Sequence, residues 1–309
     1  MVSSWVELGE QGETAEGKIV LLNPPFKGYS QTVAYRTFGA TLAAKLGAVA
    51  VLVRSVTPFS ISSPHTGSQS RPQSISAEWA QRMGVPPLFV GNYSDVPQIP
   101  AAALAAEDTA LLARLQARGR RVRVRLHMGA QNWGDVTSRN TIVELEGTVR
   151  PDEVVIFGGH IDSWDVGQGA IDDAGPSLVC LQAVLAMLRS GLRPYRTIRL
   201  VFFTAEEIGL YGGSQHYANQ LAQGVDKVHL VAELDHGIFN PVGISLQAEL
   251  QVMQVAIYTA SLIAATGATQ VVSRRTSLSD LNDFPSKHNV PSMSLIMVRA
   301  SAHYAHHLP

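Results

Sequence analysis

Hydrophobic and polar positions alternate along the chain with the periods of strands and helices. Short apolar runs rich in β-branched residues predict six strands, over Gly17–Leu22, Ala48–Arg54, Glu153–Phe157, Thr197–Phe203, Val228–Leu234 and Val290–Val298. Apolar residues at helical spacing predict five helices, over Thr37–Leu46, Ala102–Gly119, Pro176–Ser190, Tyr211–Gln223 and Leu250–Ala265. Strands that alternate with helices predict an α/β fold with a mainly parallel, doubly wound sheet.

The pattern divides the chain near residue 138. Residues 1–137 predict a compact α/β module that has no cluster of ligand-type side chains of its own. Residues 138–309 predict the doubly wound domain, in which polar residues follow the strands. Any catalytic or metal-binding chemistry is therefore expected in the second part of the chain.

Composition narrows the choice of partners. Lys and Arg number 24 against 25 Asp and Glu, so no net field attracts nucleic acid or an anionic membrane. The one dense basic run, Arg118–Arg125, alternates Arg with Val and predicts an exposed strand face. The single cysteine, Cys180, excludes an internal disulfide. No apolar run of about 18 residues predicts a membrane span, and Met1–Trp5 has no signal-peptide pattern, so the compartment is unknown from the chain.

Ionisable residues gather where strands end and where a helix begins. Six such side chains stand at these points: His160, Asp172, Asp173, Glu206, Glu207 and Asp235. Each alone has an ordinary explanation, such as a core histidine, a helix N-cap or a complement to the helix dipole. Together they would meet in the crevice outside the carboxyl ends of the strands. Neutral imidazole and ionised carboxylates that converge on one point predict a divalent metal site.

Three motifs carry a family resemblance. The stretches Gly158–Asp173, Thr204–Glu207 and Glu233–Asp235 resemble the metal-binding motifs of the co-catalytic zinc aminopeptidases and carboxypeptidases. The upstream segments Tyr35–Thr37, Arg54–Val56 and Ser63–Gly67 are similar to that family's protease-associated-type inserted domain. The resemblance therefore covers almost the whole chain.

The resemblance also assigns the two parts of the chain. It implies that residues 1–137 are a protease-associated-type inserted or cap domain, incomplete on its N-terminal side. It implies that residues 138–309 are a zinc peptidase catalytic domain, truncated at the C-terminus relative to the family. For a full-length protein it implies a secreted, periplasmic or lysosomal location and a homodimer.

The same resemblance implies two zinc ions and a role for each site residue. The implied ligands are His160 and Asp235 on one ion, Glu207 and His307 on the other, and Asp172 on both. The closing histidine is one of the pair His306 and His307, and His307 is favoured. Glu206 would bind no metal and would act as the general base. Asp162 and Asp173 would support the ligands, with Asp162 holding the imidazole of His160 in one tautomer.

The expected function is that of a metallo-exopeptidase that hydrolyses dipeptides or short peptides with a free amino terminus through a zinc-bridging water. Two alternatives stay open at this point. A single-zinc acyltransferase such as a glutaminyl cyclase would differ in metal stoichiometry. A fragment without activity, acting only as a binding module, would bind no zinc tightly and hydrolyse nothing.

Overall fold

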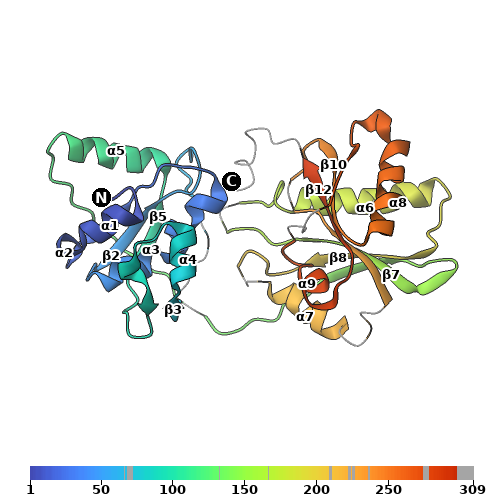
Figure 1. Ribbon diagram of the computed structural model, residues 1–309, viewed down its shortest axis with the longest axis horizontal. Helices are drawn as coiled ribbons and strands as arrows, with labels where there is room; N and C mark the ends of the chain where they lie inside the picture. Colours follow the sequence, from blue (N-terminus) through green and yellow to red (C-terminus); the bar gives the residue numbers. More distant parts are fainter. Residues whose placement is uncertain are drawn as a thin grey trace. The chain divides into compact units, whose positions relative to one another are not determined.

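The computed structural model describes residues 1–65, 67, 72–131, 133–165, 167–208, 211–221, 224, 227–235, 237–273 and 278–297. Contacts between residues divide the chain into two compact units, one ending at Gly134 and the other beginning at Asp135 (Figure 1). This boundary lies a few residues before the division expected from the hydrophobic pattern.

The first unit is a small α/β module. Its helices are α1 (Trp5–Glu10), α2 (Gly12–Ala15), α3 (Tyr29–Lys45), α4 (Ala77–Met83), η1 (Pro87–Phe89) and α5 (Ala106–Ala117). Its strands are β1 (Ile19–Leu22), β2 (Ala50–Arg54), β3 (Ser74–Ile75), β4 (Gly91–Asn92) and β5 (Ala101–Leu104). Strands β1, β2 and β5 form a parallel sheet, and β3 and β4 pair separately. Trp5, Leu42, Phe89 and Tyr93 lie buried in the core of this unit.

Two sequence predictions for the first unit are wrong. The predicted helix Ala102–Gly119 is a strand, β5, followed by helix α5, because Ala101–Leu104 pairs with β2. The pairing overrides the helical preference of this alanine-rich segment. The predicted strand in Arg118–Arg125 is absent, since these described residues pair with no strand and are exposed.

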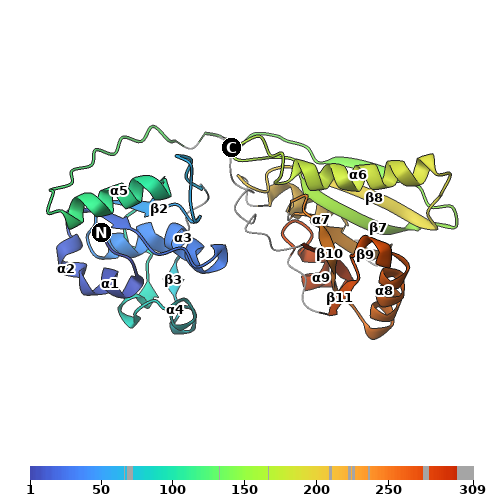
Figure 2. The same ribbon diagram turned by 90° about the horizontal axis from the view of Figure 1, so that it is seen from above.

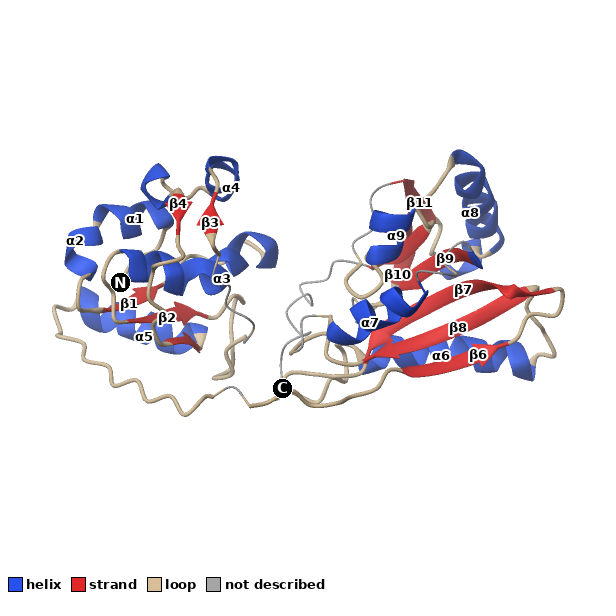
Figure 3. Ribbon diagram, turned by 90° about the horizontal axis from the view of Figure 1, so that it is seen from below, coloured by secondary structure: helices blue, strands red, loops and turns tan. Residues whose placement is uncertain are grey.

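The second unit is built on one seven-stranded sheet, drawn in red in Figure 3. Its strands are β6 (Thr141–Leu145), β7 (Arg150–His160), β8 (Arg196–Phe203), β9 (Val228–Glu233), β10 (Pro241–Gln247), β11 (Gln270–Ser273) and β12 (Ser292–Met297). Its helices are α6 (Ala174–Arg189), α7 (Gly212–Leu221), α8 (Leu250–Leu262), η3 (Ala264–Thr266) and α9 (Asp283–His288). The sheet order is β11-β10-β12-β9-β7-β8-β6.

Most neighbouring strands of this sheet are parallel. The pairs β12–β9, β9–β7, β7–β8 and β10–β11 are parallel, while β6–β8 and β10–β12 are antiparallel. The predicted α/β fold with a mainly parallel sheet is therefore confirmed. The hydrophobic pattern did not predict β6, β10 or β11.

Helices cover both faces of the central strands, as Figures 2 and 3 show for α6 and α7. Alternate residues of β8 point to opposite sides. Leu200 packs with Cys180 of α6, whereas Val201 and Phe203 pack with Tyr217 of α7. Burial on both faces explains why the central strands read as continuous apolar runs.

The register of the central strands brings their carboxyl ends to one edge. His160, the last residue of β7, lies beside Phe203, the last residue of β8. On the other side, Gly158 of β7 lies beside Glu233, the last residue of β9. The polar residues that follow these three strands are thereby collected at one place.

The helices of both units have ordinary globular lengths. The longest in the described part of the chain is α3, with 17 residues, and it contains Arg36 and Lys45. Within the described ranges, no helix is both long enough and apolar enough to cross a membrane.

Candidate metal centre

His160 lies at the centre of the polar cluster, with only 1% of its surface exposed. One ring nitrogen, Nε2, lies 3.0 Å from Asp172 Oδ1 and 3.6 Å from Asp235 Oδ1. The other, Nδ1, lies 2.9 Å from the main-chain carbonyl oxygen of Asp162. A carbonyl oxygen only accepts hydrogen bonds, so Nδ1 carries the proton and Nε2 faces the two carboxylates.

Among the residues that the structure describes, two groups of side chains could hold a metal ion, and His160 belongs to both. The first contains His160, Asp172 and Asp235, and the second contains His160, Glu206 and Glu207. Within each group the donor atoms lie within 4.8 Å of one another. The structure therefore brings together five of the predicted site residues: His160, Asp172, Glu206, Glu207 and Asp235. His306 and His307 lie outside the described residues.

Asp162 holds the loop that follows β8. Its Oδ1 accepts the backbone N–H of Glu206 and its Oδ2 accepts that of Glu207, each at 3.0 Å. Its carboxylate is 3.7 Å from His160 Nδ1, whereas its carbonyl oxygen makes the closer contact. The side chain thus orients the two glutamates, and the main chain of the same residue orients the imidazole.

The turn that carries the two glutamates is also held from its other side. Ala205 has a positive φ of 60°, a conformation that turns the chain sharply after Thr204. Asn140 Oδ1 accepts the Thr204 N–H at 3.1 Å, and its Nδ2 donates to the Gly213 carbonyl oxygen at 2.8 Å. The turn that carries Glu206 and Glu207 is therefore held by two polar side chains, Asp162 and Asn140, with two hydrogen bonds each.

Asp173 forms a hydrogen bond with the backbone of His160. It stands at the N-cap position of α6 and is fully buried, and its side chain, instead of capping the helix, accepts the His160 N–H through Oδ2 at 3.0 Å. Its peptide bond with Asp172 is cis. A Cβ added at Gly159 would overlap Asp173 Oδ2 and lie 2.7 Å from Ser177 Oγ, so this position accommodates only glycine.

The electrostatics of the cluster follow from an excess of carboxylates in a partly dry site. Burial first, and neighbouring carboxylates second, raise the pKa of Glu206 to about 8 and that of Glu207 to about 7, while the charge of His160 opposes the rise. Burial and the charge of Asp235 raise the pKa of Asp173 to about 10. Burial alone would lower the pKa of His160, but hydrogen bonds to Asp172 and Asp235 raise it well above its ordinary value.

These residues fit a divalent metal ion. Imidazole and carboxylate oxygen are ordinary zinc ligands, and a doubly positive ion would neutralise the negative charge of the converging carboxylates. The imidazole is already held through Nδ1, which leaves Nε2 to the metal side. The donor set therefore matches a metal centre of nitrogen and oxygen ligands.

Glu233 and Ser279 are site neighbours that the sequence analysis did not single out. Glu233 is 3% exposed and accepts hydrogen bonds from Ser279 and Leu281. Burial raises its pKa to about 8, although these hydrogen bonds oppose the rise. Ser279 Oγ also lies 3.0 Å from Asp235 Oδ2, so its one hydroxyl proton is shared between Glu233 and Asp235. The turn that carries Ser279 is far from Glu233 in the sequence, so no local motif indicates this contact.

Comparison with known proteins identifies the family. Peptidase family M28 matches residues 140–308. Carboxypeptidase Q of Homo sapiens is 39% identical over 309 residues, covering 99% of this chain and 60% of the relative. Carboxypeptidase Q of Xenopus laevis is 38% identical over 307 residues, covering 99% of this chain and 60% of the relative. The chain belongs to peptidase family M28, and it spans about 60% of the length of these curated relatives.

Solved structures agree with this assignment. A peptidase M28 precursor from Shewanella amazonensis superposes with a TM-score of 0.84 at 27% identity, covering 99% of this chain and 65% of that one. A zinc aminopeptidase from Bacillus subtilis, with a TM-score of 0.55 and 18% identity over 92% of this chain and 60% of that one, shares the fold. The predicted family resemblance is confirmed.

Proposed function

We propose that the second unit is the catalytic centre of a zinc-dependent metallo-exopeptidase that hydrolyses dipeptides or short peptides with a free amino terminus. The observation that carries the proposal is the convergence of His160, Asp172 and Asp235 beside a glutamate, Glu206, whose pKa is raised to about 8. Membership of peptidase family M28 and the names of the relatives, carboxypeptidase Q, support this reaction class.

The ligands are proposed for two zinc ions. His160 and Asp235 would hold one ion, Glu207 and His307 the other, and the two oxygens of Asp172 would reach both. The part concerning His307 rests on the sequence, since that residue lies outside the described ranges. Bound zinc would supply Lewis acidity, which polarises a scissile carbonyl and makes water a better nucleophile near neutral pH.

Glu206 is proposed as the general base and later the general acid. A carboxylate works best in this role when its pKa is close to the operating pH, and a pKa of about 8 meets that condition. Glu206 would accept a proton from the attacking water and return it to the leaving amine. Glu207 is its neighbour in sequence, and the two backbone N–H groups held by Asp162 fix both side chains relative to His160.

The test compares the same chemical change at adjacent positions, Glu206→Gln and Glu207→Gln. Glu206→Gln should keep its zinc content and lose at least about 100-fold in hydrolysis, the scale of a lost general base. Glu207→Gln should lose zinc as well as activity, because an amide is a poorer ligand than a carboxylate. Zinc per chain is measured by elemental analysis and hydrolysis with unblocked dipeptides on the same sample.

Two results would count against the proposal. Equal loss of zinc in both variants would overturn the division of roles between the two glutamates. A wild-type chain that binds zinc tightly yet hydrolyses no dipeptide would overturn the exopeptidase function itself. An acetylated dipeptide serves as the matched substrate control, because it lacks the free amino group.

A further inference from the structure

A buried carboxylate lies next to the metal centre without belonging to either group of donors. Glu233 ends β9, two residues before Asp235, and is 3% exposed. Burying an ionisable side chain is costly unless hydrogen bonds compensate it. The hydrogen bonds of Glu233 therefore indicate which part of the structure this side chain stabilises.

Both oxygens of Glu233 are engaged by one turn. Oε1 accepts the backbone N–H of Ser279 at 2.6 Å and its hydroxyl at 2.7 Å, and Oε2 accepts the backbone N–H of Leu281 at 2.7 Å. All three of these short contacts come from the same turn. The buried carboxyl group thus stabilises the turn that precedes α9 by accepting two of its backbone N–H groups.

Ser279 connects this turn to the metal centre. Its hydroxyl, besides contacting Glu233, lies 3.0 Å from Asp235 Oδ2, while Asp235 Oδ1 faces His160 Nε2 at 3.6 Å. Glu233 fixes Ser279 through the backbone N–H, and the hydroxyl proton of Ser279 is shared between Glu233 Oε1 and Asp235 Oδ2. The other oxygen is thereby directed toward the imidazole.

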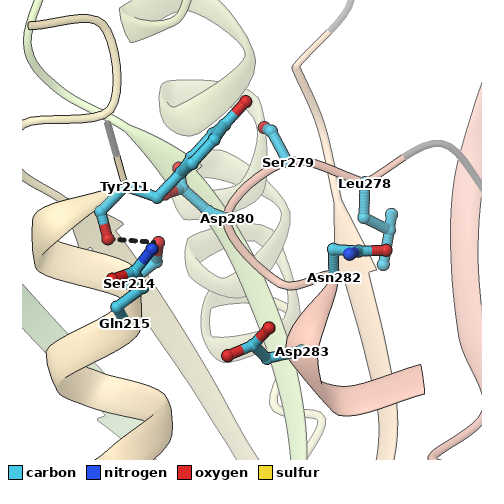
Figure 4. A pocket seen from close by; sticks show the side chains of 8 residues that line it. All are labelled: Tyr211, Ser214, Gln215, Leu278, Ser279, Asp280, Asn282 and Asp283. Atoms are coloured by element: carbon cyan, nitrogen blue, oxygen red, sulfur yellow. Dashed lines mark hydrogen bonds between the residues drawn. The ribbon is translucent and has the colours of Figure 1, made fainter. Parts of the chain in front are cut away.

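The same turn forms one wall of a polar pocket. Figure 4 shows Ser279 and Asp280 of the turn opposite Tyr211, which directly precedes α7, and Ser214, which lies in its first turn. The Ser214 hydroxyl donates to the Tyr211 carbonyl oxygen at 3.1 Å. Movement of the turn would therefore disturb both Asp235 and this pocket.

We propose that Glu233 is a positioning residue for the metal centre, acting through Ser279 on Asp235. This inference rests on the proposed function, because it assigns Asp235 to a metal ion. A glutamine at position 233 would keep one acceptor oxygen and turn an NH₂ group toward an N–H donor of the turn. The backbone N–H of either Ser279 or Leu281 would then lose its acceptor, and the turn that holds Ser279 beside Asp235 would shift.

The test measures metal affinity rather than activity. Zn²⁺ and Co²⁺ affinities of the full chain are determined by competition with a chromophoric chelator, and the visible absorption spectrum of the Co²⁺ form is recorded. Glu233→Gln should weaken binding by about 10–100-fold, as changes behind a ligand do, and should alter the Co²⁺ spectrum. Glu146→Gln, the same change at an exposed position of the second unit, is the matched control and should alter neither.

Ser279→Ala keeps the test decisive if Glu233→Gln does not fold. It removes only the hydroxyl and retains the two backbone N–H groups that bind Glu233. It should weaken metal binding to a similar degree while the urea midpoint measured with chelator stays near the wild-type value. In the double variant the losses should not add, because both substitutions break the same chain of contacts.

The outcomes separate the inference from the function. Wild-type affinity and an unchanged Co²⁺ spectrum in Ser279→Ala would overturn the positioning role, whatever the activity. Fully additive losses in the double variant would also overturn it, since Glu233 would then act by another route. Metal binding with the expected losses, but no peptide hydrolysis by the wild type, would support the positioning role and refute the exopeptidase.

Discussion

The contact between Asp162 and the turn after β8 yields a prediction with a defined size. Asp162→Asn replaces one of the two oxygens that accept the Glu206 and Glu207 N–H groups at 3.0 Å. Hydrogen bonds to a charged acceptor contribute about 1.5–3 kcal/mol each. One is lost and an NH₂ group faces a backbone donor, so the free energy of unfolding should fall by about 1.5–3 kcal/mol.

The same substitution separates two possible roles of Asp162. The imidazole of His160 is bonded to the main-chain oxygen of Asp162, which the substitution leaves in place. Metal content should therefore be largely retained, whereas hydrolysis should fall by about 10–100-fold because Glu206 is displaced. Loss of zinc with an unaltered turn would instead favour the role expected from the sequence, support of the imidazole by the carboxylate.

The assay is urea denaturation in the presence of a chelator, followed by zinc content and dipeptide hydrolysis on the folded protein. Asp165→Asn is the matched control, since Asp165 lies exposed in the same loop. It should match the wild type in all three measurements. An Asp162→Asn protein with the wild-type urea midpoint and wild-type hydrolysis would refute the reasoning.

Two further predictions concern stability. In chelator the free energy of unfolding should decrease from pH 5 to pH 8. The folded-state pKa values of Glu206 and Glu207 are about 8 and 7, against an ordinary value of 4.5. The stabilisation that these two groups contribute is therefore fully present below about pH 4.5 and is lost as the pH rises through 7 and 8. Urea midpoints across this range check it, saturating zinc should flatten the dependence, and a flat profile in chelator would contradict it. Gly159→Ala should lower stability by more than about 1–3 kcal/mol because the methyl group overlaps Asp173. Thermal melting measures this, with Gly129→Ala as the control because its Cβ meets nothing within 4 Å, and equal melting temperatures would contradict it.

The sheet and the donor residues were predictable for a shared reason. Central strands buried on both faces leave continuous apolar runs, and a polar residue directly after such a run stands at the sheet edge. His160, Glu206 and Asp235 were all placed by this rule, and the structure brings them together. To place these three residues, it was enough to know where each strand ends, which depends on the local sequence alone.

Features that depend on distant pairing were not predictable in this way. β5 became a strand because β2 offered a partner, against its alanine-rich sequence. The carboxylate of Asp162 was assigned to the imidazole two residues away, but the structure gives it two N–H groups more than forty residues along the chain. The contact of Glu233 with Ser279 spans a similar separation.

The alignment of β7 with β8 has a consequence for how the sequence can change over time. His160 lies opposite Phe203, and the two glutamates follow Phe203 after only two residues. Side chains alternate between faces, so one inserted or deleted residue in either strand would turn every later side chain to the opposite face. Substitutions among apolar residues within β7 and β8 are then tolerated far better than changes of length. Related chains should keep the spacing from each strand to its acid even where the strand's own residues have drifted.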